Sequence, residues 1–393
     1  MKKIMILGAS ILQLPAIIKA KELGFYVGVV DYNKNALGVQ YADEFFEVST
    51  NDIEKVASIA KEFNADGIVT LATDMPMRTI ARASEVCELP GISVETAIKA
   101  TDKEEMIKAF KINGVAHPWF FVIEDFEEFE KIKNKIEFPC IMKPVDSSGS
   151  RGVVYASSIQ ELKGQFEYSI KESRQRKIII EEYLEGPEVS VEVFVINKRT
   201  HVLQVTDKIT TGAPHFVEMG HTQPSRLSDD NINKIKDLCI RAVEAIGIEN
   251  GPAHIEIILT SSGPKMVELG ARMGGDCITT HLVPLSTGID MVKAMIQNAC
   301  GEAIDVTPKY QKGSAIRYFK SHKGKLVGVD CLDEVKEIHG IKQVSLVKSI
   351  GEQIDNIYSS GDRVGFVIAQ GNDADDAENI CCKALEMIKL HIE

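Results

Sequence analysis

The sequence lacks any long hydrophobic run. None of its 393 residues fall in a stretch that reaches the roughly 18–20 apolar residues of a membrane-spanning helix. Met1, Lys2 and Lys3 lead directly into "IMILGAS", an apolar run that is too short for a signal peptide. We therefore expect a cytoplasmic protein without a membrane partner.

The chain also has fewer basic than acidic residues, and its cysteines show no paired motif. The chain has 45 Lys and Arg against 57 Asp and Glu, which gives a net charge of −12. Such a balance disfavours binding to nucleic acid or to an anionic membrane surface. The 8 cysteines form no C-x-x-C pair and lack the spaced histidines of a zinc site. We interpret them as buried or incidental thiols in a reducing compartment.

What the sequence contains is three blocks of different pattern, the first covering residues 1–98. Apolar strands alternate with helices there, which predicts a parallel, doubly wound sheet. Gly8 follows the first strand at the expected start of a helix, a position where a phosphate could bind. Asp31 ends the second strand, as in nucleotide-binding folds. The turn "GASILQ" lacks the G-x-G-x-x-G of a dinucleotide site, which argues against a dehydrogenase. We expect this block to form one wall of a substrate cleft.

The second block, residues 99–305, begins with a helix over "TDKEEMIKAFKING", with Thr101 or Asp102 as its N-cap. Strand patterns follow, and "GPAHIEIILT" and "PKMVELGAR" form an antiparallel hairpin around the turn "SSG". In the third block, residues 306–393, short strands precede a helix over "DADDAENICCKALEMIKLHI". The fold class is therefore α/β and α+β: a parallel-sheet domain, a two-part middle domain and a small C-terminal α+β domain.

A lysine and a loop of small residues in the middle block suit nucleotide phosphates. Lys143 ends the apolar strand "IMKPV", where its ammonium group can neutralise phosphate oxygens. Glycines in the loop let backbone N–H groups approach those oxygens. This is not a P-loop, and a plain surface hairpin is the alternative interpretation. The loop residues are Ser147, Ser148, Gly149, Ser150 and Gly152.

The segment "KIIIEEYLEGPE" follows, and it suits the adenine ring. A strand that leaves its sheet here offers an apolar slot with an unpaired backbone N–H and C=O. Glu188, after the turn at Gly186 and Pro187, can accept from ribose hydroxyls. The alternative is a surface turn that carries glutamates. The strand end comprises Glu181, Glu182, Tyr183 and Leu184.

Two carboxylates stand inside otherwise apolar strands of the predicted hairpin. Burying Glu256 and Glu268 is costly unless each finds a cation. On adjacent strands they form a hard oxygen site suited to Mg²⁺ carrying polyphosphate. Arg272 adds a cation just beyond Glu268, and a structural salt bridge between Arg272 and one of these glutamates is the alternative.

These motifs, together with Lys103, occur in the order of the ATP-grasp superfamily, which the chain resembles over nearly its whole length. The resemblance implies an N-terminal pre-ATP-grasp domain, an ATP-grasp domain and a C-terminal domain. It also implies that Lys103 and Lys143 contact the phosphates of ATP. The segment 147–152 then closes over the phosphates, 181–184 reads adenine, and Glu188 holds the ribose.

The same resemblance assigns the metal and the reaction. Glu256 and Glu268 are implied as ligands of Mg²⁺, with Mn²⁺ as an alternative, and Arg272 as the group that stabilises an acyl phosphate. Many relatives carry Asn where this chain has Gly270, and there it is a further metal ligand. This departure weakens an assignment to carbamoyl-phosphate synthetase or biotin carboxylase, and it leaves the number of metal ions open.

The segment 205–226 and the segment 272–290 resemble the amino-acid-ligase-like branch of the superfamily. This implies a carboxylate–amine or carboxylate–thiol ligase that forms an acyl phosphate and releases ADP and phosphate. We expect small-molecule carboxylate and amine substrates and leave a homodimer open. The alternatives are a purine-pathway ligase such as phosphoribosylglycinamide synthetase, or a non-catalytic ATP-binding sensor. Candidate substrate residues are Lys208, His215, His221 and Arg226.

Overall fold

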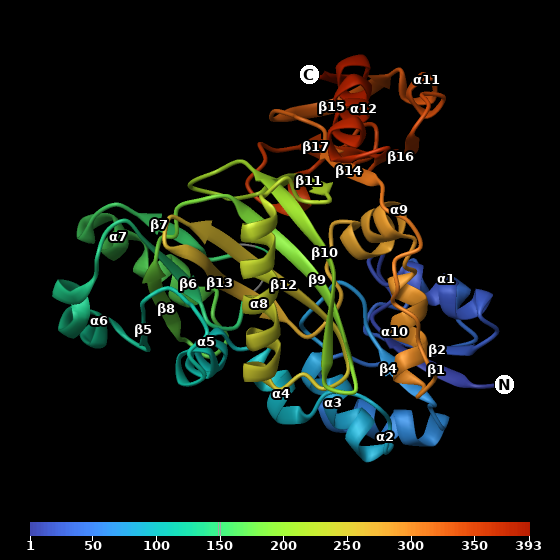
Figure 1. Cartoon of the computed structure of the whole chain (residues 1–393), viewed down its shortest axis with the longest axis horizontal. Helices are drawn as coiled ribbons and strands as arrows, with labels where there is room; N and C mark the ends of the chain where they lie inside the picture. The colour runs from blue at the N-terminus through green and yellow to red at the C-terminus, as the bar shows by residue number, and fades with distance from the viewer. Residues whose placement is uncertain (148, 150) are drawn as a thin grey trace.

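The computed structural model describes residues 1–147, 149 and 151–393. Ser148 and Ser150 of the predicted phosphate loop lie outside the described residues. The N-terminal sheet and the four-stranded sheet of the middle block lie on opposite sides of a large central sheet, which continues into the C-terminal block (Figure 1). Across the described ranges, no helix has the length and apolar character needed to cross a membrane.

The first block forms the predicted parallel sheet, in the order β3-β2-β1-β4. Its central strand β1 is buried along nearly its whole length, as an apolar run between two helical layers should be. One short strand and two helices of this block were not predicted: β3, α3 and α4. The elements are β1 (Lys3–Leu7), α1 (Leu14–Glu22), β2 (Tyr26–Asp31), η1 (Val39–Tyr41), β3 (Glu44–Glu47), α2 (Ile53–Phe63), β4 (Gly67–Val69), α3 (Met77–Val86) and α4 (Val94–Lys99).

The possible phosphate position at Gly8 is not at a helix start, because α1 begins only at Leu14. The Gln13 side chain fills the space beside Gly8, where an added Cβ would lie 2.8 Å from Gln13 Oε1. Asp31 instead holds the backbone, since its carboxylate accepts from the N–H groups of Ala9 and Asn33, both at 2.8 Å. These contacts give Asp31 a structural role.

The middle block begins with α5 (Lys103–Ile112), and Asp102 is its N-cap because its carboxylate accepts from the backbone of Glu104 and Glu105. A four-stranded antiparallel sheet follows in the order β5-β8-β6-β7, covered by two helices. These elements are β5 (Phe120–Ile123), α6 (Phe126–Ile132), η2 (Lys133–Lys135), β6 (Cys140–Pro144), β7 (Val154–Ala156), α7 (Ile159–Lys171) and β8 (Ile178–Glu182).

An eight-stranded sheet, in the order β13-β12-β9-β10-β11-β14-β18-β16, forms the centre of the molecule. It includes the predicted hairpin, and α8 (Asp229–Ile246) packs its apolar face against it. Its strands are β9 (Glu188–Ile196), β10 (Arg199–Thr210), β11 (Glu218–Gln223), β12 (Gly251–Thr260), β13 (Gly263–Gly270), β14 (Gly313–Tyr318), β16 (Ile341–Leu346) and β18 (Gly365–Gly371).

Two parts of the chain pack across the predicted block boundaries. The segment after the hairpin, with α10, packs on the first block, where Met291 and Met295 share a core with Ile17 of α1. The third block contributes β14, β16 and β18 to the central sheet. The elements of this part are η3 (Ile278–Leu282), α9 (Val283–Thr287), α10 (Met291–Ala299), β15 (Gly324–Asp330), α11 (Leu332–Lys336), β17 (Gln353–Ile354) and η4 (Ser360–Asp362).

The predicted C-terminal helix is too long. Helix α12 (Ala374–Met387) ends at Met387, and β19 (Lys389–Ile392) pairs with β15. Along β19, exposed Lys389 and His391 alternate with half-buried Leu390 and Ile392. This is the two-residue period of a strand, which the prediction merged into the preceding helix.

Candidate nucleotide and metal site

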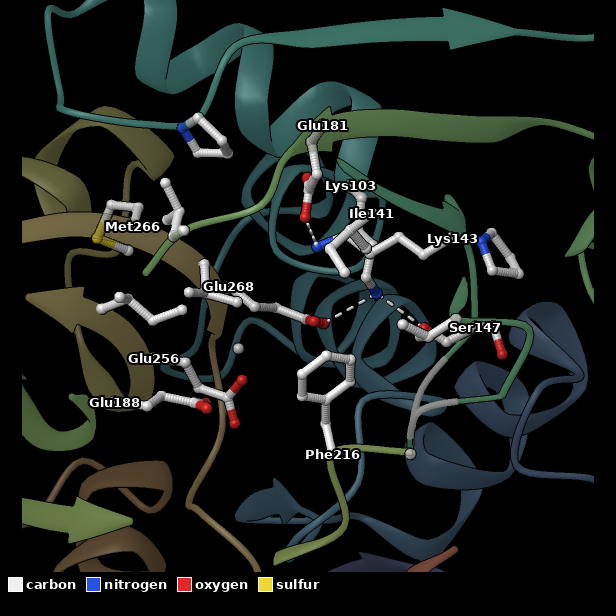
Figure 2. A pocket seen from close by; sticks show the side chains of 18 of the residues that line it. Lys103, Ile141, Lys143, Ser147, Glu181, Glu188, Phe216, Glu256, Met266 and Glu268 are labelled. Atoms are coloured by element: carbon white, nitrogen blue, oxygen red, sulfur yellow. Dashed lines mark hydrogen bonds and ion pairs between the residues drawn. The ribbon is translucent and has the colours of Figure 1, made fainter. Parts of the chain in front are cut away.

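A cavity of about 230 Å³ lies between the four-stranded sheet and the central sheet. Side chains from β6, β8, β12 and β13 point into it, and Lys103 reaches it from the start of α5 (Figure 2). Most residues predicted from the sequence line this one space. They are Lys103, Lys143, Ser147, Gly149, Glu181, Glu182, Tyr183, Leu184, Glu188, Lys208, Glu256, Glu268 and Arg272.

Two lysines bring positive charge into the cavity, each held by a carboxylate. Lys103 Nζ donates to the carbonyl of Ser147 at 2.7 Å and to Glu268 at 3.0 Å. Lys143 Nζ lies 2.5 Å from Glu181. Burial alone would lower the pKa of Lys143, but the charges of Glu181 and Glu268 outweigh it and raise that pKa. Lys143 is therefore a fixed cation.

The strand β8 ends at Glu182, so the backbone of the next two residues leaves the sheet beside the cavity. Largely apolar side chains form the wall of this space. The ring centroids of Tyr183 and Phe216 are 6.3 Å apart. The Glu182 carboxylate turns away to Lys265 at 2.8 Å. This arrangement suits a flat heterocycle read by backbone groups. The apolar wall comprises Ile141, Val153, Leu184, Phe216, Ile258 and Met266.

Glu256 and Glu268 stand directly opposite each other on β12 and β13. Lys208 approaches Glu256 to 3.1 Å, while Lys103 holds Glu268. Burial alone would raise the pKa of Glu256, but Lys208 and His254 hold it well below its usual range. Two adjacent carboxylates beside the lysines form a donor set that fits Mg²⁺.

For a metal ion, this site has two carboxylates, Glu256 and Glu268. Within the described part of the chain, no group of three or more His, Cys, Asp and Glu side chains is placed to hold a metal ion. Phosphate oxygens and water would therefore supply the other ligands, in keeping with the preference of Mg²⁺ for substrate phosphates and water.

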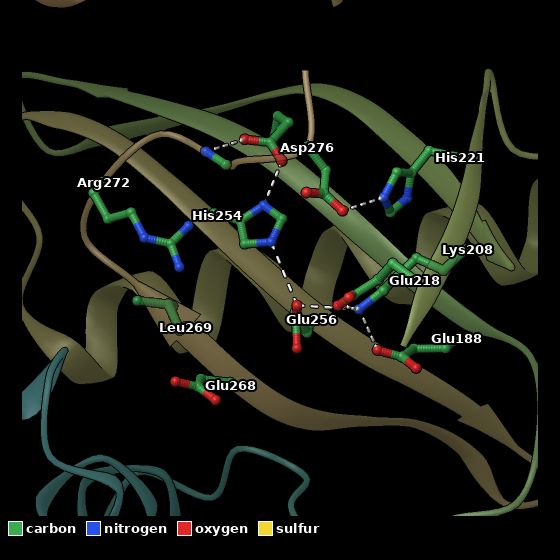
Figure 3. A network of polar contacts seen from close by, with 12 residues as sticks. Glu188, Lys208, Glu218, His221, His254, Glu256, Glu268, Leu269, Arg272 and Asp276 are labelled. Carbon is green, nitrogen blue, oxygen red and sulfur yellow. Dashed lines mark hydrogen bonds and ion pairs between the residues drawn. The ribbon is translucent and has the colours of Figure 1, made fainter. Parts of the chain in front are cut away.

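A buried polar network supports the carboxylate pair from within the central sheet (Figure 3). Lys208 lies 2.5 Å from Glu188 and 3.7 Å from Glu218. Burial alone would lower the pKa of Lys208, but Glu256 and Glu188 raise it well above its ordinary value. Burial also raises the pKa of Glu188, in spite of Lys208. The main role of Lys208 is therefore to balance the negative charge of the glutamates around it.

Sequence reasoning missed His254, which precedes Glu256 by two positions on the same face of β12. Its Nδ1 lies 2.5 Å from Glu192, its direct partner on β9, and its Nε2 lies 3.5 Å from Glu256. Burial alone would lower the pKa of His254, but Glu192 raises it to about 9. The two-residue spacing of His254 and Glu256 is the signal that could have revealed it.

Arg272 lines the cavity, but neither hairpin glutamate is its ion-pair partner. The guanidinium binds Asp74, with Nε 2.8 Å from Oδ1 and Nη2 2.9 Å from Oδ2. Burial alone would lower the pKa of Arg272, but Asp74 raises it. Asp74 lies in the segment between β4 and α3 of the first block, and it is a second residue that the sequence analysis did not identify.

Three of the predicted substrate residues do not line the cavity. His215 is exposed with its ring 4.9 Å from the Tyr358 ring, and His221 is buried with Nε2 3.3 Å from Asp276. Arg226 pairs with Asp375 and Glu378, each at 2.5 Å. His215 and Arg226 thus contact the C-terminal block, and sequence pattern does not distinguish such contacts from a substrate site.

Gly152 also lies off the cavity wall. An added Cβ there would meet Pro144 at 2.7 Å and Glu172 at 2.8 Å, and its φ is +74°. The glycine therefore allows close packing at the base of the loop, where a side chain has no room.

Two segments of the chain match known domain families. Residues 136–280 match the ATP-grasp domain, and residues 317–393 match the L-amino acid ligase C-terminal domain 2. The chain therefore contains an ATP-grasp domain, as the order of its motifs predicted. Its C-terminal block contains a domain of the L-amino acid ligase type.

Several similar proteins are ligases. Phosphoribosylamine–glycine ligase of Methanobrevibacter smithii is 25% identical over 388 residues, covering 90% of this chain and 86% of that protein. Alanine–anticapsin ligase of Bacillus subtilis is 25% identical over 300 residues, covering 69% of this chain and 63% of that protein. The crystal structure of L-amino acid ligase from Bacillus licheniformis has the same fold, with a TM-score of 0.87, 23% identity and coverage of 100% and 99%. The prediction of an ATP-grasp ligase is confirmed.

Proposed function

We propose that this protein activates the carboxylate of an amino acid as an acyl phosphate and joins it to an amine, releasing ADP and phosphate. The observation that carries the proposal is the convergence of two lysines, two carboxylates and an arginine on one cavity. An acyl phosphate forms when a carboxylate attacks the γ-phosphorus, and these groups suit the charge of that step. A thiol as nucleophile is the alternative acceptor.

In this proposal ATP lies with its adenine between the Tyr183–Leu184 backbone and the apolar wall. Glu188 accepts from the ribose, while Lys103 and Lys143 bind phosphate oxygens. Glu256 and Glu268 would hold Mg²⁺, or Mn²⁺, which neutralises phosphate charge when bound. In the same proposal the phosphates lie beside the loop backbone at Ser147 and Gly149, both of which line the cavity.

Arg272 acts on the acyl group. Its guanidinium lies on the same side of the sheet as His254 and the two glutamates (Figure 3). There it can hold the acyl phosphate and the charged tetrahedral species that forms when the amine attacks. Small-molecule substrates, a cytoplasmic location and a homodimer remain predictions.

A second candidate is the purine-pathway reaction, favoured by the 90% coverage of this chain in the match to phosphoribosylamine–glycine ligase. The test is ADP release with pairs of amino acids, and separately with glycine plus phosphoribosylamine, with the products identified by mass spectrometry. A dipeptide with ADP supports the proposal. AMP as the nucleotide product would overturn the mechanism, and turnover only with phosphoribosylamine would favour the second candidate.

The same assay tests the remaining alternatives. Strict dependence on bicarbonate would overturn the amino acid as the activated partner. ATP binding without turnover for every substrate pair would indicate a sensor.

A further inference from the structure

Asp74 occupies space that a side chain at position 270 would need. A Cβ added to Gly270 would lie 2.7 Å from Asp74 Oδ1 and 3.2 Å from Arg272 Cζ. Contacts below 3.0 Å force a neighbour to move. The absence of a side chain at Gly270 is therefore what lets Asp74 reach Arg272 from the first block.

The Asp74–Arg272 pair keeps capacity for a ligand. Arg272 uses one N–H on each of three nitrogens, for the two Asp74 oxygens and for the carbonyl of Met273. A guanidinium has about five N–H donors, so roughly two have no acceptor among the described residues. The Asp74 carboxylate accepts only from Arg272 within that same part of the chain, although such a group has about four acceptor sites.

The pair is also accessible, because both side chains line the cavity and remain partly exposed, 16% for Arg272 and 18% for Asp74. Asp74 additionally lines a neighbouring cavity of about 280 Å³, which shares Lys103, Ser147 and Glu268 with the first. Asp74 therefore stands where the phosphate region meets a second space that is large enough for a small molecule.

The backbone just before Asp74 has an unusual conformation. Ala72, two residues earlier, has a φ of +59°, which an L-residue with a Cβ adopts only at a cost. The segment follows β4, at the carboxyl end of a parallel sheet, which is where ligands bind in such sheets. Both features are typical of a segment shaped to present a side chain to a ligand.

We infer that Asp74 binds the α-ammonium group of the amino acid whose carboxylate is activated. An amino acid carries opposite charges one carbon apart, and the Arg272–Asp74 pair presents the complementary charges side by side. Arg272 holds the carboxylate end, and Asp74 holds the ammonium end. The inference rests on the proposed function and adds a specificity residue to it: acids without an α-ammonium group leave Asp74 without its partner.

The test measures the first half-reaction with hydroxylamine, which traps an acyl phosphate as a hydroxamate and releases phosphate. Each of a panel of L-amino acids is compared with its 2-hydroxy acid, for example L-alanine with L-lactate. Wild type should prefer the amino acid. In Asp74→Asn, the KM for the amino acid should rise roughly 10- to 100-fold, the range of one charge-assisted hydrogen bond, while the KM for ATP is unchanged.

Three further variants sharpen the test. Gly270→Ala keeps the Asp74 carboxylate but displaces it, so it should lose the same preference. Asp74→Glu keeps the charge and should restore part of the preference. Glu54→Gln removes a carboxylate from a surface pair with Arg82 in the same block and should keep the wild-type preference.

The outcomes separate the two claims. Equal losses for the amino acid and the hydroxy acid in Asp74→Asn would overturn the inference alone, because they indicate a structural role. Absence of hydroxamate and ADP from wild type with every amino acid would overturn the proposed function, and the inference with it.

Discussion

Two arginine–carboxylate clusters join distant parts of this chain, and their surroundings differ. Arg272 and Asp74 are 198 residues apart in sequence and face a cavity. Glu378 of α12 binds both Arg226 and Arg317, and none of these three side chains lines that cavity. The same kind of ion pair thus faces a cavity in one region and joins packed elements in the other. What separates the two roles is accessible space beside the charges.

The first test of this difference removes one carboxylate charge in each region. We expect Glu268→Gln to lower turnover on the order of 100- to 1,000-fold or more, because a neutral amide is a poor Mg²⁺ ligand beside developing phosphate charge. Melting temperature should change little. ADP release and thermal unfolding measure the two effects.

Glu378→Gln is the matched variant. It should keep turnover and lower the melting temperature by a few degrees, because it weakens the contact of buried Arg317 with α12. Near wild-type turnover in Glu268→Gln would show that this glutamate is not a metal ligand.

A lysine substitution should give the next largest effect. Lys143→Ala should weaken ATP binding roughly 10- to 100-fold, since it removes a buried cation from the phosphate region. Isothermal titration calorimetry measures the affinity. Lys163→Ala, which removes a surface lysine paired with Glu130 in the same part of the chain, should leave ATP affinity unchanged. Equal affinities for the two variants would contradict the assignment of Lys143.

Arg226→Ala tests the structural region and should have a smaller effect. Its side chain is 37% exposed, so we expect the free energy of unfolding to fall by less than about 1 kcal/mol. Urea unfolding measures this change. The KM for substrate should stay at the wild-type value. An increase in KM at unchanged stability would instead indicate that Arg226 contacts the substrate.

The last expected effect depends on pH and concerns the ion pair between Asp276 and Arg363. Burial alone would raise the pKa of Asp276, but Arg363 and His221 hold it well below its usual range. Because the folded-state pKa is depressed, this stabilisation is complete above the unfolded pKa of about 3.9 and is lost as pH falls toward the folded value. The stability cost of Asp276→Asn should therefore be constant from pH 8 to 5 and shrink below pH 4, as followed by urea unfolding. A cost that grows on acidification would contradict the assignment.

The sequence was most informative for features that depend on the alternation of apolar residues and on the order of neighbouring segments. Alternation in β12 and β13, with the turn "SSG" between them, predicted a hairpin, and the register places Glu256 opposite Glu268. A lysine at a strand end was likewise found at the cavity. These features depend on residues close in sequence, which pattern reasoning can relate.

Contacts between distant segments were the part that sequence pattern could not supply. Asp74 meets Arg272 only because a loop of the first block folds over β13, and nothing in the sequence around Asp74 indicates this. Arg226 looked equivalent to Lys208, yet one lies against α12 and the other between three glutamates. Partners of this kind follow from the three-dimensional fold.

The central sheet continues into the last third of the chain, so the C-terminal block is not a separate module. Strand β11 pairs with β10 on one side and with β14 on the other, from Gly220–Arg317 to Gln223–Ser314. A fragment ending near residue 305 would turn β11 into a bare edge strand, with a row of unsatisfied backbone groups open to other chains. We therefore expect the C-terminal block to shield β11 from pairing with other chains.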